Sequence, residues 1–452
     1  MELGEILGKI EASRDDIVDT MCGMISIPAI SPEAGGNGEA ARADYLMGKL
    51  GGFDSVQRID VPHFDDPTIM RPNILAKKNG KKRGTVWIIA HTDTVPAGDL
   101  SKWKTDPFTG VYRDGRVYGR GTEDNGQSVI SSIFASKFIE KGALEGMSLG
   151  IALVADEEMA SSMGICHLID ENCFDPADIF VVPDWGSPGG SCIEVNEKSL
   201  IWLRFDIEGR ACHASTPDKG ANALRAGCRL MGDVLEGLEH RFGDSDQIFT
   251  PPVSSFEPTK CTVASENVNT VPGEWSFNID ARVLPKYNLD DVLAAAQRIG
   301  STVAKETGAV IKVSEVQRHV SGGSSSVDSP AYKALSDAVE SVIGRAPRAV
   351  GVGGATCANF FRQKGYDAYV WQTGGGTLHA PNEYVEIDNL LTDTKVFATL
   401  FYNLCVKGRA AIRNVPRTPH SGGGRGRNVL AVARRAGFRS AASALLDPPV
   451  FE

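Results

Sequence analysis

The segment Val86–Asp93, VWIIAHTD, decides the fold class of this chain. Its first five residues are apolar and predict a buried strand, which runs directly into His91-Thr92-Asp93. In an open α/β sheet the carboxyl ends of the strands point into one crevice, so polar residues placed there gather in space. Two further apolar runs are followed by acidic residues in the same way, LGIALVA (149–155) by Asp156-Glu157-Glu158 and IFVVP (179–183) by Asp184.

The pattern changes at about Glu197, where expected strands and helices follow in the order β-α-β-β-α-β. That order predicts a compact sandwich of two helices on a four-stranded antiparallel sheet. The expected strands are 200–207, 261–264, 274–283 and 310–316, and the expected helices are 221–238 and 289–307. Gly322–Ser326, GGSSS, then predicts a linker that returns the chain to the first domain.

The expected fold class is therefore α/β, a mixed-sheet domain with helices on both faces that carries an inserted two-helix, four-strand α+β sandwich. One of the helices, Asn125–Lys141, is predicted from the four-residue spacing of Ile130, Phe134 and Phe138. A further strand is expected at Ala368–Thr373. The predicted boundaries are 1–196 and 318–407 for the two parts of the first domain, 197–317 for the inserted domain and 408–452 for a tail.

Charge is distributed unevenly along the chain. The 452 residues carry a formal net charge of −10. The tail after Lys407 holds eight Arg against Asp447 and Glu452, a net charge of +6, which leaves −16 for residues 1–407. An acidic body argues against a nucleic-acid partner. The tail, with its stretch HSGGGRGR (420–427), is expected to be a disordered basic appendage.

Compartment and membrane association can also be predicted from composition. No apolar run reaches the ~18 residues that a membrane helix needs. The N-terminal segment lacks the basic start and apolar core of a signal peptide, so none is expected. The nine cysteines are scattered, with no C-x-x-C, which favours reduced thiols over a disulfide framework. A cytoplasmic protein without a membrane partner is therefore expected.

Five metal-type positions lie just beyond expected strands or at the start of a helix. Imidazole and carboxylate ligands without thiolate suit a catalytic Zn²⁺, Co²⁺ or Mn²⁺ site. Five such ligands are too many for one tetrahedral ion with an open position, but they suit two ions ~3.5–4 Å apart that share a bridging carboxylate. Of the adjacent Glu157 and Glu158, one could bind metal while the other moves a proton. The positions are His91, Asp124, the Glu157-Glu158 pair, Asp184 and His379.

Each of these signals has an ordinary structural explanation when it is taken alone. A histidine after a strand is often a hydrogen-bonded loop residue, and an aspartate at a helix start is usually a cap. An acidic pair after a strand is usually solvated, and a histidine among glycines, such as His379, is often a turn residue. All five in this order at strand or helix ends favour a shared site.

Eight motifs run through the chain: HTDTVP (91–96), GRGTEDNGQ (119–127), ADEE (155–158), PD (183–184), GRACHASTP (209–217), NTVP (269–272), DARVLP (280–285) and LHAPNE (378–383). Together they resemble the dizinc metallopeptidases that include acetylornithine deacetylase, succinyl-diaminopimelate desuccinylase, aminoacylase and glutamate carboxypeptidase. The resemblance covers residues 10–406 and is highly specific because the motifs occur together.

The resemblance implies two divalent metal ions, zinc above all, with cobalt or manganese as alternatives. Asp124 looks like the carboxylate that bridges the two ions. Glu158 and His379 look like the remaining ligands of one ion, and His91 and Asp184 look like those of the other.

The resemblance also implies roles for two further carboxylates. Glu157 resembles the general base and acid of the family. Asp93 is similar to the carboxylate that orients the histidine ligand, here His91, and raises its basicity. The peptide after the bridging aspartate, Asp124-Asn125, is typically cis in this family.

The inserted sandwich resembles the family's lid or dimerisation domain, so a homodimer through this domain is expected. His213 resembles a catalytic histidine that stabilises the oxyanion. Asn269 and Arg282 fall on motifs that grip the substrate, and the loop with Gly353 and Gly354 borders it. The alternatives are a packing role for His213 and a structural ion pair for Arg282.

Two stretches depart from the family pattern. Asn125-Gly126-Gln127 replaces the common Asp-Lys-Gly without removing an expected ligand. Gly353–Cys357, GGATC, replaces the Gly-Gly-Thr-Asp common in desuccinylases, which leaves the desuccinylase assignment open.

The expected function is metal-dependent hydrolysis of an amide bond in an N-acyl amino acid or small peptide with a free carboxylate, as in deacetylases and desuccinylases. A carboxypeptidase or dipeptidase of the same family is the alternative. From other classes, a non-catalytic metal- or peptide-binding relative and a scaffold that binds an acidic partner through the basic tail are the remaining hypotheses.

Overall fold

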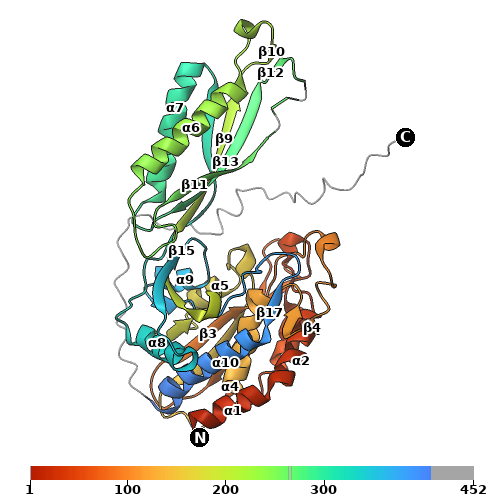
Figure 1. Ribbon diagram of the computed structural model, residues 1–452, viewed down its shortest axis with the longest axis vertical. Helices are drawn as coiled ribbons and strands as arrows, with labels where there is room; N and C mark the ends of the chain where they lie inside the picture. Colours follow the sequence, from red (N-terminus) through yellow and green to blue (C-terminus); the bar gives the residue numbers. More distant parts are fainter. Residues whose placement is uncertain (1, 263, 266, 409–452) are drawn as a thin grey trace, which may run out of the picture. The chain divides into compact units, whose positions relative to one another are not determined.

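A computed structural model describes residues 2–262, 264–265 and 267–408 (Figure 1). Contacts divide the chain into two compact units. Among the described residues, the first unit consists of 2–192, 328–347 and 366–408, and the second of those within 193–327 and 348–365. The predicted domain boundaries stay a prediction, and the basic tail predicted for 408–452 lies, from residue 409 on, outside the described residues.

The second unit includes residues 348–365, which the sequence pattern assigned to the first domain. The reason is a strand pairing that no local pattern indicates: β15 (Arg348–Val352) pairs with β8 (Cys192–Glu197) in a two-stranded sheet. Helix α9 (Ala358–Gln363) follows β15 and remains in the same unit.

The first unit is built on a six-stranded mixed sheet in the order β1-β2-β6-β3-β7-β16. β3 is parallel to β6 and to β7, and β7 is parallel to β16, whereas β2 is antiparallel to both β1 and β6. Every residue of β3 and β6 is buried, so both faces of the central strands are covered, and their stretches VWIIA and LGIALV are continuously apolar. The strands are β1 Ser55–Pro62, β2 Met70–Lys78, β3 Thr85–His91, β6 Ser148–Val154, β7 Ile179–Val181 and β16 Ala368–Tyr369.

Helix α4 (Gln127–Lys137) contacts β3 and β6, and α10 (Ile387–Phe401) contacts α4 (Figure 1). α4 begins two residues later than the predicted Asn125–Lys141 because non-helical φ and ψ values at Asp124 and Asn125 precede it, and it ends at Lys137. The other helices of the unit are α1 Leu3–Ala12, α2 Arg14–Ile25, α3 Ala40–Met47, α5 Ile165–Asp170 and α8 Pro330–Ile343. The mixed α/β fold is confirmed, although the strand predicted at Ala368–Thr373 ends at Tyr369.

A small three-stranded sheet, in the order β17-β5-β4, also belongs to the first unit. β4 (Val111–Arg113) and β17 (Tyr384–Glu386) lie on either side of β5 (Arg116–Tyr118). In the antiparallel pairing of β5 with β17, Tyr118 faces Tyr384. The segment that follows Tyr118 therefore lies beside the segment that precedes Tyr384.

The second unit contains a four-stranded antiparallel sheet in the order β11-β13-β9-β14 and the helices α6 and α7. Leu203, Phe205 and Ile207 alternate with exposed or half-buried residues on β9 and form a core with the helices. The bounds are β9 Ser199–Glu208, β10 Cys212–His213, α6 Ala223–Arg241, β11 Ser255–Cys261, β12 Thr270–Val271, β13 Glu274–Val283, α7 Leu289–Thr307 and β14 Val310–His319.

The strand predicted at 261–264 instead occupies Ser255–Cys261 as β11. Glu257–Cys261 are all exposed, so the alternation that identifies a half-buried strand is missing there. β11 also contains Pro258 and a register shift between Pro258 and Lys260, both typical of an edge strand. Among the helices that the structure describes, none combines the length and apolarity needed to cross a membrane.

Candidate metal centre

Four neighbouring strands of the large sheet lead to the predicted metal-type side chains. His91 is the last residue of β3, the Glu157-Glu158 pair begins a helical turn after β6, Asp184 follows β7, and His379 lies in the loop between β16 and β17. β6, β3, β7 and β16 are adjacent and parallel, so their carboxyl ends meet at one edge of the sheet. Asp124 joins them from the segment between β5 and α4.

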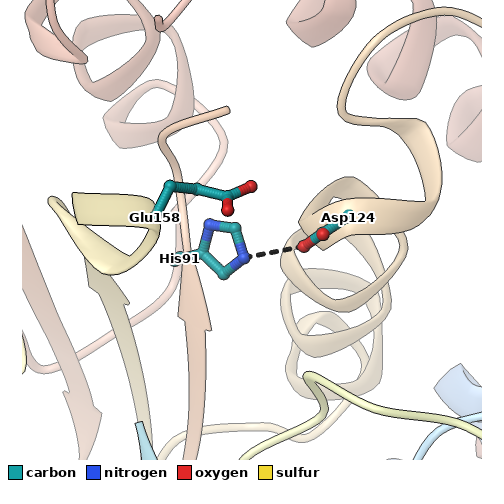
Figure 2. A group of neighbouring side chains, drawn as sticks. All are labelled: His91, Asp124 and Glu158. Atoms are coloured by element: carbon teal, nitrogen blue, oxygen red, sulfur yellow. Dashed lines mark hydrogen bonds and ion pairs between the residues drawn. The ribbon is translucent and has the colours of Figure 1, made fainter. Parts of the chain in front are cut away.

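Asp124 lies between two imidazoles. Its Oδ1 is 2.9 Å from Nε2 of His91, and its Oδ2 is 3.0 Å from Nε2 of His379. Nε2 of His91 is also 3.2 Å from Oδ1 of Asp184, and Nε2 of His379 is 3.2 Å from Oε1 of Glu158. Figure 2 shows His91 facing Asp124, with Glu158 beside them. The five predicted ligands thus form two groups that meet at one carboxylate.

Glu157 lies in the same cluster. Ligand atoms of His91, Glu157 and Asp184 are all within 4.8 Å of one another. Burial, and then the charge of Asp184, raises the pKa of Glu157 well above its usual value, and burial raises that of Glu158. The cluster holds four carboxylates around two imidazoles: Asp124, Glu157, Glu158 and Asp184 around His91 and His379. Bound cations would stabilise this many acidic groups in one place. Nitrogen and oxygen donors without cysteine fit Zn²⁺, Co²⁺ or Mn²⁺.

Without metal, both imidazoles of the cluster hold their protons strongly. Hydrogen bonds with Asp124 and then Glu158 raise the pKa of His379 to about 10. Burial opposes the charge of His91, but Asp184 and Asp124 outweigh it and raise the pKa of His91 well above its usual value. Burial alone would raise the pKa of Asp124, but hydrogen bonds with His379 and His91 lower it. The surrounding carboxylates thus favour the protonated form of both imidazoles.

Loading the protein with Zn²⁺ is expected to release protons, because an imidazole must be neutral to bind metal. Since the folded-state pKa of His379 is raised to about 10, the apparent zinc affinity should increase with pH through the neutral range and fall as pH decreases. Calorimetric titration in two buffers of different ionisation enthalpy measures the number of protons released. Zinc affinity that does not change with pH would contradict the predicted histidine ligands.

Asp93 is fully buried behind His91. Nδ1 of His91 lies 3.1 Å from the backbone oxygen of Asp93 and 3.4 Å from its Oδ1. The two carboxylate oxygens of Asp93 accept hydrogen bonds from the backbone N–H groups of Glu157 (3.1 Å) and Glu158 (3.0 Å). One side chain therefore positions both the imidazole and the acidic turn.

Asn125, one of the departures from the family pattern, contacts the cluster directly. The peptide bond between Asp124 and Asn125 is cis, as the resemblance implies. Nδ2 of Asn125 donates hydrogen bonds to the backbone oxygen of Pro183 (2.8 Å) and to Oδ1 of Asp184 (2.9 Å). Asn125 therefore orients a predicted ligand, a contact that the motif comparison did not reveal.

Glu123 and Glu383 are two further carboxylates that the sequence reasoning did not single out. Glu383 is fully buried and accepts hydrogen bonds from the backbone N–H groups of Gly121 (3.0 Å), Glu123 (2.9 Å) and Asp124 (3.0 Å). It also pairs with Arg120 at 2.6 Å. Both glutamates lie inside the quoted motifs, where an unassigned acidic residue close to a ligand was the available signal.

His213 and Asn269 lie close together in the second unit, and their side chains are exposed. His213 faces Thr270 in the β10–β12 pairing, and the N–H of Ala214 donates to the backbone oxygen of Asn269 (2.8 Å). Oγ of Ser215 lies 2.7 Å from Nδ1 of His213. An exposed side chain does not fit the alternative of a packing residue.

Arg282 is held by two partners within the second unit. Its Nε and Nη2 donate to Oδ1 (2.7 Å) and Oδ2 (3.0 Å) of Asp280, and its Nη1 donates to the backbone oxygen of Gly353 (2.8 Å). The structural ion pair is therefore present. The side chain is still 32% exposed, so this pairing does not bury it. Gly354, the other predicted loop residue, is exposed.

Comparisons with known proteins agree with these motifs. Residues 87–403 match peptidase family M20/M25/M40. An uncharacterized metallohydrolase from Methanocaldococcus jannaschii is 34% identical over 405 residues, 83% of this chain and 96% of that protein. A succinyl-diaminopimelate desuccinylase from Sulfurovum sp. is 24% identical over 386 residues, 84% of this chain and 97% of that protein. The solved structure of a dipeptidase from Saccharomyces cerevisiae has the same fold, with a TM-score of 0.67 at 17% identity over 88% of this chain and 98% of that one. The resemblance is thereby confirmed, and the chain belongs to peptidase family M20/M25/M40 and is a metallohydrolase.

Proposed function

We propose that the chain hydrolyses the amide bond of an N-acyl amino acid or small peptide with a free carboxylate, as a deacetylase or desuccinylase does. The strongest support is the position of Asp124, whose two carboxylate oxygens face the imidazoles of His91 and His379. A carboxylate so placed can serve two divalent ions at once. The proposed ions are zinc, with cobalt and manganese as alternatives.

Each proposed ion has two ligands of its own besides the shared Asp124. His91 and Asp184 would hold one ion, and Glu158 and His379 would hold the other. When bound, the two ions supply Lewis-acid activation of a water molecule and of the scissile carbonyl.

Glu157 is proposed to take the proton of the attacking water and to pass it to the leaving nitrogen. The position of Glu157, within 4.8 Å of ligand atoms of His91 and Asp184, supports this role. Asp93 is proposed to keep His91 in one orientation through the contacts at Nδ1.

Arg282, His213 and Asn269 are proposed to hold the substrate, as the family resemblance implies. Arg282 suits a carboxylate because its planar fork can donate two parallel hydrogen bonds. His213 is proposed to stabilise the oxyanion through Nε2, since its Nδ1 is the atom beside Ser215. Asn269, Gly353 and Gly354 are proposed to contact the rest of the substrate.

Dimerisation through the second unit, in the cytoplasm, is part of the proposal. β14 is an edge strand of the four-stranded sheet, and Val310 and Val316 on it are exposed. Edge strands offer backbone groups for pairing with a second chain.

A dipeptidase or carboxypeptidase is the second candidate, and the loop Gly353–Cys357 is the observation that favours it. Thr356 there donates its hydroxyl to the buried carboxylate of Glu197 at 2.7 Å. This loop lacks the acidic residue of the desuccinylase pattern, so the proposed desuccinylase specificity has less support than the hydrolase class.

The test combines metal analysis with a substrate panel. The panel holds N-acetyl and N-succinyl amino acids, dipeptides, and matched amides without the free carboxylate. We expect about two metal ions per chain, activity that is lost on chelation, and hydrolysis only of substrates with a free carboxylate. Arg282→Met should remove this discrimination by raising KM for the free-carboxylate substrates.

The outcomes separate the hypotheses. Hydrolysis of dipeptides alone would favour the second candidate. Two metal ions without turnover of any panel member would favour a non-catalytic metal- or peptide-binding relative. Equal turnover of acids and matched amides would contradict the role of Arg282 while leaving the hydrolase class intact.

A further inference from the structure

Glu123, the residue before Asp124, is almost fully buried, and its carboxylate grips the loop that carries His379. Oε1 accepts hydrogen bonds from the backbone N–H groups of Gly375 and Gly376, both at 2.7 Å. Oε2 accepts from the backbone N–H (2.6 Å) and the hydroxyl (2.5 Å) of Thr377. Four short hydrogen bonds to one carboxylate thus fix three consecutive residues that end two positions before His379.

The same loop grips the Asp124 segment in return. Glu383 accepts the backbone N–H groups of Gly121, Glu123 and Asp124. The N–H of Gly119 donates to the backbone oxygen of Glu383 (3.0 Å), which continues the β5–β17 pairing. Two segments about 260 residues apart are therefore joined in both directions: the glutamate of each accepts hydrogen bonds from backbone N–H groups of the other. Each segment also carries a predicted ligand.

The two histidine ligands depend to different degrees on the hydrogen bonds between these segments. The side chain of His91 is 1% exposed and lies at the end of a fully buried strand. The side chain of His379 is 53% exposed and projects from a loop, with φ of +59° at His379 itself. His91 is thus positioned by the core of the sheet, whereas His379 depends on the contacts that hold its loop.

We propose that Glu123 is a positioning residue that sets the affinity of one of the two metal positions, the one formed by His379 and Glu158 with Asp124. The other position, formed by His91 and Asp184, does not depend on Glu123. This inference rests on the two-metal site of the proposed function and adds a residue that touches neither ion nor substrate.

The test is Glu123→Gln, read by titration of the metal-free full chain with Co²⁺. The amide keeps the size of the side chain but replaces one carboxylate oxygen with an –NH₂ group. This group cannot accept the hydrogen bonds that the loop donates to that oxygen, and it faces those donors instead. We expect one Co²⁺ to bind as in the wild type and the second to bind about 10- to 100-fold more weakly. The spectrum at one equivalent should be that of an isolated ion, as in His379→Ala.

Asp178→Asn is the matched control. Asp178 is also a buried carboxylate that accepts backbone N–H groups, those of Thr85 (2.7 Å) and Asp175 (2.9 Å), but at the opposite end of β3 from His91. Its loss should lower the melting temperature and leave both Co²⁺ affinities unchanged. If Glu123→Gln does not fold, Thr377→Val removes one of the four hydrogen bonds and should weaken the same ion to a smaller degree.

Two Co²⁺ ions bound to Glu123→Gln with wild-type affinities would overturn the inference, and so would equal weakening of both ions. Neither result depends on turnover, so both leave the proposed hydrolysis untouched. Two ions in the wild type without hydrolysis would contradict only the proposed function. A wild-type chain that binds a single Co²⁺ would contradict both.

Discussion

Glu157→Gln is expected to lower kcat by about 10²- to 10⁴-fold while two metal ions remain bound. The amide has the size of the carboxylate but cannot accept and return a proton. The backbone N–H of Glu157, which donates to Asp93, is unchanged by the substitution. The measurement is kcat and KM on the best substrate of the panel, together with metal analysis of the same sample.

The control for this variant is Glu158→Gln, which changes the neighbouring carboxylate in the same way. Because Glu158 is a proposed ligand, this change should lower metal content, whereas Glu157→Gln should not. Near-normal turnover of Glu157→Gln, or loss of metal from it, would contradict the role assigned to Glu157.

The metal-free form of Glu157→Gln should be at least as stable as the wild type at neutral pH. The pKa of Glu157 is raised in the folded chain, so its ionised form is less favourable there than in the unfolded chain. Above the unfolded-state pKa of about 4.3, this carboxylate therefore opposes folding, and the neutral amide removes that cost. An equal or higher melting temperature would show that lost activity is not lost folding.

The sequence predicts that the ligands gather at the carboxyl ends of the parallel strands, because this placement depends on local patterns. β3 and β6 are buried throughout, so VWIIA and LGIALVA are recognisable without their partners. The side chains after them follow from the chain order alone. That adjacent parallel strands share one edge is a general property of α/β sheets, so convergence needed no knowledge of the exact strand order.

The positioning contacts could not be predicted in this way. Glu123 and Glu383 bind backbone N–H groups, which every residue except proline has, so the sequence contains no sign of the partner. These hydrogen bonds require β5 to pair with β17, two strands of three residues each. The pairing of β15 with β8, which places residues 348–365 in the second unit, is likewise not indicated by any local pattern in the sequence.

Asp124→Ala is expected to weaken both metal ions, which distinguishes it from every other single ligand substitution. Its Oδ1 faces His91 and its Oδ2 faces His379, so removal of the side chain takes one ligand from each position. Loss of a residue that merely supports a ligand costs about 10- to 100-fold in affinity, so loss of the ligand itself should exceed ~100-fold for each ion. Turnover should fall further than in Glu157→Gln, because the base then has no activated water to act on.

The measurement is titration of the metal-free variants Asp124→Ala, His379→Ala and His91→Ala with Zn²⁺. Each histidine variant should lose one tight ion and keep the other, whereas Asp124→Ala should keep neither. The backbone N–H of residue 124 still donates to Glu383 after the substitution, so the segment retains its anchor and lost metal cannot be ascribed to a displaced loop. One tight ion retained by Asp124→Ala would mean that this carboxylate serves a single position, and the bridge that carries the proposed two-metal function would not exist.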